Sequence, residues 1–306
     1  MKSSAREFLP QSYGAYQREG VIRIYFAGID LGSTMTKIVI IDEDEQVLTS
    51  IIAHTGAEHR RLANKVMEEA LDRTSLSIDE ISLVIATGYG RINVPFADRQ
   101  VTELTCHALG VASLFPNVRV AIDIGGQDAK GLKVRNGRLV DFVMSDKCAA
   151  GTGRFLEVIA DSLDLKVEDL GSISLRSTKK VSVSSTCTVF AQQEVINHLS
   201  EGVPLEDVVA GLHDAIASRV ARMVKRLKVE PDVVFTGGVA KNIGVVRALE
   251  ENLGCSVLVP EEPLLSGAIG AALLGKELVL KALARGETIQ AGKRRLEEAT
   301  FFKQGT

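Results

Sequence analysis

Hydrophobic and polar positions alternate along this chain in short blocks, and the blocks predict strands joined by polar turns. Two apolar, β-branched runs at residues 24–29 and 37–41 flank the turn Asp-Leu-Gly-Ser-Thr-Met-Thr, so they predict a hairpin. A further strand is predicted over residues 81–86, where it runs into Thr-Gly-Tyr-Gly, and a second strand–turn–strand begins at Val118. Residues 1–24 are polar and are expected to form an N-terminal extension.

Between these strands, apolar residues recur at the i, i+3, i+4 spacing of amphipathic helices. The spacing predicts helices over residues 60–72, 155–163, 189–199, 207–227 and 267–280. One more strand, at residues 232–235, runs into Thr236-Gly237-Gly238. Strands and helices that alternate, with glycine turns between them, predict an α/β fold.

The two predicted hairpins carry an internal repeat. The segments GIDLGSTMTKIVI and AIDIGGQDAKGLK align when one is shifted by 93 positions. The shift matches three polar pairs: Asp30 with Asp123, Gly32 with Gly125, and Lys37 with Lys130. Two unrelated hairpins can share turn residues, but three polar matches within one strand pair favour a duplicated domain. We therefore expect two similar lobes, each of which contributes one hairpin to a shared cleft.

Composition narrows the possible classes of function. The 306 residues are 45% hydrophobic and 25% charged, as in ordinary globular proteins, and the net charge is −3. That charge lacks the basic excess typical of nucleic-acid or anionic-membrane binding, so neither partner is expected. The sequence contains no apolar run of ~18 residues and no apolar core of a secretory signal, which predicts a cytoplasmic protein. Its four cysteines are sparse, which leaves metal or redox chemistry as their first candidate role.

The two hairpin turns have the composition of phosphate-binding turns. Gly32-Ser33-Thr34 and Gly125-Gly126-Gln127 offer backbone N–H groups and polar side chains to an anion, and the glycines let it approach closely. Asp30 and Asp123 each end the preceding strand. A carboxylate in that position can hold Mg²⁺ through its water shell beside a phosphate. Together the turns predict a phosphate clamp with Mg²⁺.

A third glycine-rich segment, Thr236 to Asn242, follows a strand and precedes a helix, where it can approach a nucleoside closely. The order hairpin, hairpin, strand–Gly-Gly–helix resembles the actin, Hsp70 and sugar kinase ATPase superfamily. A rival Walker A loop at residues 270–276 fails, because Glu277 stands where Ser or Thr must bind Mg²⁺. The sequence has neither the dinucleotide-binding pattern G-x-G-x-x-G nor the serine hydrolase pattern G-x-S-x-G.

Two of the cysteines, Cys148 and Cys187, directly precede predicted helices. Free N–H groups and the helix dipole favour a thiolate or an anionic cluster at such positions. Spacing alone leaves three interpretations open: two buried apolar cysteines, zinc bound across a dimer, or a [4Fe–4S] cluster. The cluster needs four thiolates, which a twofold homodimer would supply.

Six segments together resemble one family: GIDLGSTMTK, ATGYGR, IDIGGQDAK, DKCAAGTGRF, SSTCTVFAQQEV and TGGVAKN. They look like the activators, or ATPase components, of 2-hydroxyacyl-CoA dehydratases, which are related to the ATPase subunits of benzoyl-CoA reductase (the BadF/BadG/BcrA/BcrD family). The resemblance covers residues 26–275. It implies a duplicated actin/Hsp70/sugar kinase-like ATPase fold with ribonuclease H-like halves. We expect the first lobe at 25–116 and 267–306 and the second at 117–266.

The family also implies an activity and its cofactors. The protein is expected to be a homodimer with one [4Fe–4S] cluster between its subunits, and Cys148 and Cys187 match the cluster ligands. Hydrolysis of ATP to ADP, with Mg²⁺, would drive one-electron transfer to a partner iron–sulfur dehydratase or reductase. An upstream donor such as ferredoxin or flavodoxin would supply the electron.

Site residues are carried over from the family position by position. Gln127 would orient the attacking water, with Asp30 and Asp123 completing the catalytic set. The matched nucleotide positions are Gly32, Ser33, Thr34, Met35, Thr36, Lys37, Gly125, Gly126, Gly237, Gly238, Lys241 and Leu264. Near Leu264 the chain departs from the family, because Pro263-Leu264-Leu265-Ser266 replaces the usual polar residues.

Other functions remain open at this point. A small-molecule kinase of the same fold would use Asp128 or Asp146 as its catalytic aspartate. An ATP-sensing scaffold would need no iron. If the protein is an electron donor, the recipient would be a 2-hydroxyacyl-CoA dehydratase, an aromatic acyl-CoA reductase or a double-cubane reductase. The five histidines show no metal spacing and are expected at surface or core positions, and the basic residues between 219 and 228 are expected on a solvated helix face.

Overall fold

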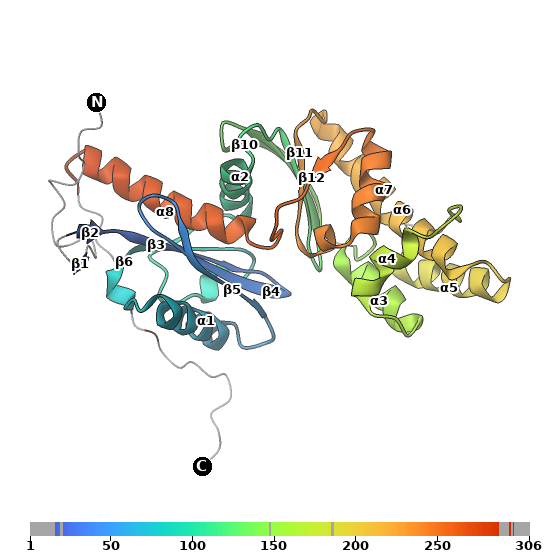
Figure 1. Cartoon of the computed structure of the whole chain (residues 1–306), viewed down its shortest axis with the longest axis horizontal. Coiled ribbons are helices and arrows are strands. Elements are labelled where there is room, and N and C mark those ends of the chain that lie inside the picture. The colour runs from blue at the N-terminus through green and yellow to red at the C-terminus, as the bar shows by residue number, and fades with distance from the viewer. Residues whose placement is uncertain are drawn as a thin grey trace, which may run out of the picture. The chain divides into compact units, whose positions relative to one another are not determined.

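A computed structural model of the chain describes residues 16–18, 21–146, 148–184, 187–287, 294 and 296. The chain divides into two compact units (Figure 1). Unit 1 comprises Met1–Ser113 and Leu265–Thr306, and unit 2 comprises Leu114–Leu264. Most of the predicted N-terminal extension lies outside the described residues, and its described part is a small antiparallel pair, β1 (Tyr16–Arg18) with β2 (Val21–Arg23).

Unit 1 is built on a mixed five-stranded sheet with the order β5-β4-β3-β6-β7. Its strands are β3 (Tyr25–Leu31), β4 (Met35–Ile41), β5 (Val47–His54), β6 (Ile81–Thr87) and β7 (Arg99–Gln100). The first three form an antiparallel meander, and β6 and β7 add parallel to β3. The predicted hairpin is therefore confirmed as β3 and β4.

Two helices cover opposite faces of this sheet (Figure 1). Successive side chains of a strand point to opposite faces, and in β3 Ile29 packs with α1 (His59–Thr74), whereas Phe26 packs with α8 (Ser266–Ala284). Helix α8 approaches β3 so closely that a Cβ on Gly28 would lie 2.1 Å from the Ala268 carbonyl oxygen. Helix α2 (Glu103–Leu114) and the 3-10 turns Ile78–Glu80 and Arg91–Asn93 complete the unit.

Unit 2 repeats this architecture. Its sheet has the order β10-β9-β8-β11-β12, with the same pattern of antiparallel and parallel neighbours. The strands are β8 (Val120–Ile124), β9 (Ala129–Arg135), β10 (Arg138–Ser145), β11 (Val233–Thr236) and β12 (Val257–Leu258). Equal strand order in both units is what a duplicated domain produces, and each unit places its Asp–Lys hairpin at the centre.

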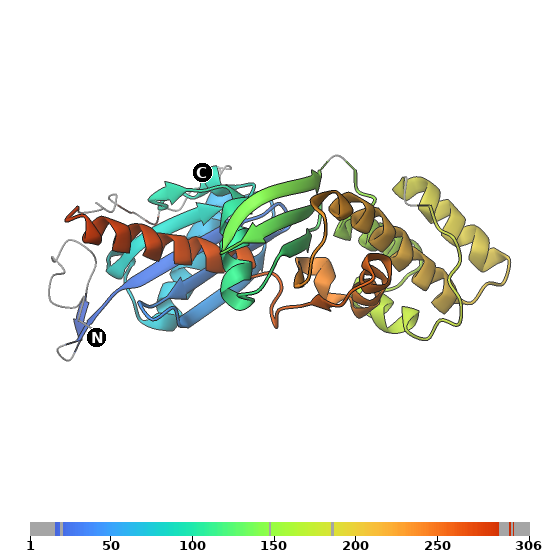
Figure 2. The ribbon, with the colours of Figure 1, turned by 90° about the horizontal axis from the view of Figure 1, so that it is seen from above.

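The units differ in the connection that leaves the third strand. In unit 2 a helical insertion separates β10 from α6 (Leu205–Val224), and it gathers at the end of the unit away from the sheet (Figure 2). The insertion contains α3 (Gly153–Ser162), the 3-10 turn Val167–Asp169, α4 (Leu170–Ser174) and α5 (Thr188–Ser200). Helix α6 continues as the 3-10 turn Lys225–Leu227, and α7 (Ile243–Leu253) comes after the 3-10 turn Gly238–Lys241.

The predicted helices are confirmed as α1, α3, α5, α6 and α8, and the predicted strands as β3, β4, β6, β8 and β11. The α/β fold of two similar lobes is likewise confirmed. Among the described residues, no helix is both long enough and apolar enough to span a lipid bilayer.

Candidate functional site

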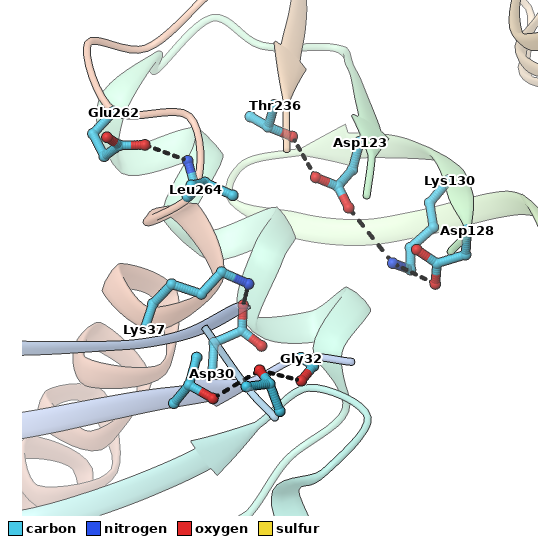
Figure 3. Close-up of polar contacts among 11 residues, drawn as sticks. Asp30, Gly32, Lys37, Asp123, Asp128, Lys130, Thr236, Glu262 and Leu264 are labelled. Atoms are coloured by element: carbon cyan, nitrogen blue, oxygen red, sulfur yellow. Dashed lines mark hydrogen bonds and ion pairs between the residues drawn. The ribbon is translucent and has the colours of Figure 1, made fainter. Parts of the chain in front are cut away.

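The first polar turn of unit 1 begins at Asp30, near the end of β3. Asp30 stands opposite Lys37 of β4 in the strand register, so the two side chains share one face of the sheet. Lys37 Nζ lies 2.9 Å from Asp30 Oδ2, and both side chains are nearly buried (Figure 3). The register of the hairpin thus builds a buried ion pair at the turn.

The second oxygen of Asp30 is the most distinctive atom of this turn. Asp30 Oδ1 is buried and has no hydrogen-bond partner among the residues that the structure describes. Glycines give the carboxylate its space: a Cβ on Gly88 would lie 2.3 Å from Oδ1, and one on Gly267 would lie 2.9 Å from Oδ2. A buried carboxylate oxygen that accepts no hydrogen bond lowers the stability of the fold, and the water shell of a bound cation would donate hydrogen bonds to it. The site therefore fits the Mg²⁺ that the sequence predicts beside Asp30.

The rest of this turn is held by its own backbone and by Thr55. The Gly32 N–H donates to the Met35 carbonyl at 3.2 Å, and Thr55 Oγ1 donates to the Gly32 carbonyl at 2.9 Å. The predicted site residue Thr36 is fully buried, and its hydroxyl lies 3.0 Å from Thr55 Oγ1. The structure thus uses the Thr36 side chain inside the fold, whereas Ser33 is exposed at the tip.

The second polar turn, in unit 2, has the same pair in a different setting. Lys130 Nζ lies 3.5 Å from Asp123 Oδ2 and 2.8 Å from Asp128 Oδ2. Thr236 of β11 donates a hydrogen bond of 3.1 Å to Asp123 Oδ1, so Asp123 lies between Thr236 and Lys130 (Figure 3). Neither Thr236 nor Lys130 was among the predicted site residues, although Lys130 is part of the repeat.

The backbone of this turn is bonded to the helix that comes after Cys148. The N–H groups of Gly153 and Arg154, the first two residues of α3, donate to the carbonyls of Gly125 and Gly126 at 2.8 and 2.9 Å. Gln127, at the tip of the turn, is exposed. The predicted phosphate turn and the start of α3 are therefore one hydrogen-bonded unit.

A third glycine-rich loop lies directly after β11. Gly237 adopts φ +85°, and a Cβ there would lie 2.4 Å from the Ile124 carbonyl oxygen, so this position requires glycine. Its N–H donates to the Pro263 carbonyl at 3.0 Å, which ties the loop to the segment that carries Leu264. Gly238 is exposed, and Lys241 forms an exposed ion pair of 2.8 Å with Glu262.

Both predicted cluster ligands lie ahead of helices that pack on each other. Cys187 is the N-cap residue of α5 but makes no side-chain cap hydrogen bond, and Cys148 precedes the first residue of α3, Gly153. Both thiols are partly exposed. Lys147, Ser185 and Thr186, which flank them in the predicted motifs, lie outside the described residues. Helices α3 and α5 contact each other.

The number of ligands limits what one chain can bind. No cluster of three or more potential metal-ligating side chains occurs in the part of the chain that the structure describes. Two thiols per chain agree with a four-thiolate centre only if two chains supply it. Cys106 is a poor ligand candidate, because it is fully buried and burial raises the pKa of its thiol to about 12.

Comparisons with known proteins agree with this geometry. The sequence pattern of the BadF/BadG/BcrA/BcrD ATPase family matches residues 27–275. The 2-hydroxyisocaproyl-CoA dehydratase activator of Clostridioides difficile is 49% identical over 251 residues, which cover 82% of this chain and 94% of the relative.

Solved structures extend these comparisons to the fold. A structure of the activator of the 2-hydroxyisocaproyl-CoA dehydratase from Clostridium difficile with bound ADPNP matches with a TM-score of 0.80 at 47% identity, over 87% of this chain and all of that one. A glucokinase from Streptomyces griseus, 14% identical with a TM-score of 0.51 over 83% of this chain and 99% of its own, shares the fold alone. The sugar kinase-like fold expected from the sequence is thereby confirmed.

Proposed function

Because this chain belongs to the BadF/BadG/BcrA/BcrD ATPase family, we propose that it uses ATP hydrolysis to deliver single electrons to a partner dehydratase. The observation that carries the proposal is the hydrogen bonding of the predicted phosphate turn to the helix that follows Cys148. Gly153 and Arg154 of α3 donate to the carbonyls of Gly125 and Gly126, so a nucleotide-dependent change in that turn would be passed to the helix that follows Cys148.

Each unit would offer backbone groups that suit a nucleotide. Unit 1 would offer the turn at residues 32–37 to the phosphates, with Lys37 neutralising charge. Asp30 would hold Mg²⁺ through water, which its unpartnered buried oxygen favours. Unit 2 would offer Gly125 and Gly126 to phosphate and the segment Gly237–Lys241, next to Leu264, to the adenosine.

Hydrolysis needs an oriented water molecule beside the γ-phosphate. Gln127 is exposed at the tip of its turn and has the side chain for that role. Asp123 is held by Thr236 and Lys130, so we assign it to fixing the turn through charge rather than to abstracting a proton. In this proposal Asp30 would hold the metal ion, and Asp123 would fix the conformation of its turn.

Cys148 and Cys187 would hold a [4Fe–4S] cluster jointly with the same residues of a second copy. When bound, the cluster supplies a one-electron reductant. The positive ends of the helix dipoles at the starts of α3 and α5 favour an anionic centre there. The first turn of α5 exposes Val189 and Phe190 by 68% and 64%, and an exposed apolar pair directly after Cys187 supports burial against a second chain.

The class of partner is inferred from the relatives. The Clostridioides difficile relative is named as an activator of 2-hydroxyisocaproyl-CoA dehydratase, and we propose a 2-hydroxyacyl-CoA dehydratase as the partner, which would hold its own iron–sulfur centre. Ferredoxin or flavodoxin would supply the next electron to the protein after each transfer. Nucleotide exchange in the turns would then alternate the α3 segment between two positions and make electron delivery directional.

A kinase on this fold is less well supported. Its catalytic aspartate would have to accept a proton from a hydroxyl group. Asp128 lies 2.8 Å from Lys130 Nζ, so its carboxylate already serves an ion pair. Asp146, the other candidate, precedes the Cys148 segment and is exposed.

Anaerobic purification tests the proposal. The protein should be brown, dimeric in sedimentation analysis, and contain about four irons per two chains. Cys148→Ser and Cys187→Ser should each abolish iron binding and electron delivery to a dehydratase, while Cys255→Ser, a matched change at another partly exposed cysteine, should leave both intact. Colourless, iron-free protein from the same preparation would contradict the cluster, and an unchanged iron content in both Cys148→Ser and Cys187→Ser would contradict its ligands.

A further inference from the structure

Helix α6 crosses unit 2 between the glycine-rich loop and the insertion that carries the cysteines. Near its middle, His213 is 1% exposed, and His213 Nε2 lies 3.2 Å from Asn242 Nδ2. Asn242 closes the glycine-rich loop and is the N-cap of α7. A single hydrogen bond therefore joins the end of this loop to α6.

The direction of that bond is fixed by the cap. Asn242 Oδ1 accepts from the N–H groups of Gly244 and Val245 at 3.0 and 3.2 Å, so its amide nitrogen must face His213 as the donor. The imidazole must then accept at Nε2 and carry its proton on Nδ1, which is buried without a partner. Desolvation lowers the pKa of His213 to about 3, so the neutral ring that this bond requires is present at physiological pH.

The same helix holds the segment that leads to Cys187. Asp207, in its first turn, accepts hydrogen bonds from the N–H groups of Thr178 and Lys179 at 2.8 and 3.1 Å. One turn further along, a Cβ on Gly211 would lie 2.2 Å from the Val181 carbonyl oxygen. These contacts fix the backbone at residues 178–181 to α6.

The other end of α6 holds the segment after Cys148. The side chain of Arg219 lies along Gly151, where a Cβ would come within 3.0 Å of Arg219 Cδ. Gly151 has φ +100°, which only glycine adopts readily. Arg219, Val220 and Arg222 also line a cavity with Gly151 and Ser145. Helix α6 thus contacts both cysteine segments and the loop that ends at Asn242.

We propose that His213 is a positioning residue that fastens the nucleotide loop to α6, so that nucleotide bound at the loop changes the exposure of both Cys148 and Cys187. The inference rests on the proposed function for the nucleotide loop, but it does not require the cluster to be present. It adds a second connection to the one between Gly125 and α3, and it reaches the Cys187 segment through α6.

The test measures thiol reactivity in full-length, iron-free protein. Alkylation rates of Cys148 and Cys187 with iodoacetamide are followed by mass spectrometry, with and without ADP or a non-hydrolysable ATP analogue. In the unmodified protein, we expect nucleotide to change both rates several-fold. His213→Leu removes the acceptor and should abolish the change at Cys187, whereas His213→Gln, whose side-chain carbonyl can accept from Asn242, should restore it.

A second variant distinguishes the loss of this hydrogen bond from misfolding of the His213→Leu variant. Asn242→Ser keeps an N-cap hydroxyl for α7 but is too short to reach His213, so it should reproduce the loss seen in His213→Leu. Circular dichroism and nucleotide affinity are measured on every variant. A full nucleotide response at Cys187 in folded His213→Leu or Asn242→Ser overturns the inference, as does an unmodified protein that binds nucleotide without any change at either cysteine. Failure to bind nucleotide at all overturns the proposed function itself.

Discussion

The two units place the same Asp–Lys pair on the same hairpin but surround it differently. In unit 1, Lys37 contacts Oδ2 of Asp30, and Oδ1 is left buried without a hydrogen bond. In unit 2, Thr236 donates to Asp123, and Lys130 is shared with Asp128. The two units therefore share one strand order, but the hairpin carboxylate keeps an unbonded oxygen in unit 1 and has both oxygens in polar contacts in unit 2.

The connection after the third strand separates the units further. In unit 1 a few residues lead from β5 to α1, whereas in unit 2 the whole of α3 to α5 lies between β10 and α6. Both proposed cluster ligands lie in this insertion. The repeated part of the fold thus supports ATP chemistry, and the redox role that we propose depends on sequence that only unit 2 carries in this position.

The largest expected effect concerns a contact that holds unit 1 together. Arg294 lies beyond the family match and pairs with Asp98 at 2.5 Å, with side chains 3% and 4% exposed, and it also donates to the carbonyls of Ile78, Ile81 and Ser82. Arg294→Met should lower the free energy of unfolding by about 3–5 kcal/mol, because the Asp98 carboxylate stays buried and loses the opposite charge of Arg294.

Urea unfolding measures this loss. Arg247→Met is the matched control in unit 2, because Arg247 pairs with Glu251 on the surface of α7, where such a pair contributes roughly 0.5 kcal/mol. Equal losses in both variants would show that Arg294 does not anchor unit 1.

The next effect tests the division of labour between the two carboxylates. Asp30→Asn should lower the rate of Mg²⁺-dependent ATP hydrolysis on the order of 10²-fold, since metal-ion stabilisation of a transition state is worth several kcal/mol. Asp123→Asn should act mainly on stability, because Lys130 then loses one of two carboxylates. Steady-state ATPase assays and urea unfolding of both variants separate the two roles. Equal losses of ATPase activity in the two variants would contradict the separate roles that we assign to Asp30 and Asp123.

A smaller effect is expected from the hydrogen bond between Thr236 and Asp123. Thr236→Val keeps the shape of this fully buried side chain and removes the donor to Asp123 Oδ1. A hydrogen bond to a charged group contributes about 1.5–3 kcal/mol, so urea unfolding should show a loss in that range. Thr55→Val, at another buried threonine hydroxyl in unit 1, tests whether the loss depends on the carboxylate. A smaller loss at Thr55 is expected because both of its partners are neutral.

In both units, some strands and helices could be predicted from the sequence and others could not. The central hairpins and their aspartates could be predicted because buried strands give continuous β-branched runs, and because the same pattern occurs twice in the internal repeat. The third strands, β5 and β10, were missed because apolar residues also stand at their exposed positions, Val47 and Leu48 in β5 and Val140 and Phe142 in β10. Apolar and polar residues therefore do not alternate in these two segments as they do in a typical half-buried strand. Helix α2 was missed because apolar residues surround most of it, so it shows little helical periodicity.

The site residues that no sequence pattern revealed depend on contacts between distant segments. Thr236 lies next to Asp123 because β11 pairs parallel with β8, and no local pattern contains that register. His213 was expected at a surface or core position, and it is a core residue. Its bond to Asn242 joins residues 29 positions apart on two packed helices, which only the folded chain brings together. The predicted roles of Gln127, Lys241 and Leu264 remain predictions.

The smallest effect is a dependence of stability on pH that belongs to unit 2. His213 titrates near 6.5 when the chain is unfolded, and desolvation lowers its pKa to about 3 in the folded protein. Between these values the unfolded chain binds more protons, so the contribution of His213 is complete above pH 6.5 and is lost as the pH falls towards 3. The slope should reach about 1 kcal/mol per pH unit below pH 6.

Urea unfolding at pH 7.5, 6.5, 5.5 and 4.5 measures that slope, and His213→Gln, which cannot titrate, should flatten it. Asp207 does not interfere, since hydrogen bonds from the Lys179 and Thr178 N–H groups hold its pKa below the usual 3.8. Its contribution to stability is therefore complete above the usual value of 3.8 and is lost only as the pH falls below it, outside the range of the measurement. An unchanged slope in the His213→Gln variant would mean that the ring is hydrated or charged in the folded protein, and the bond between His213 and Asn242 would then have the opposite donor.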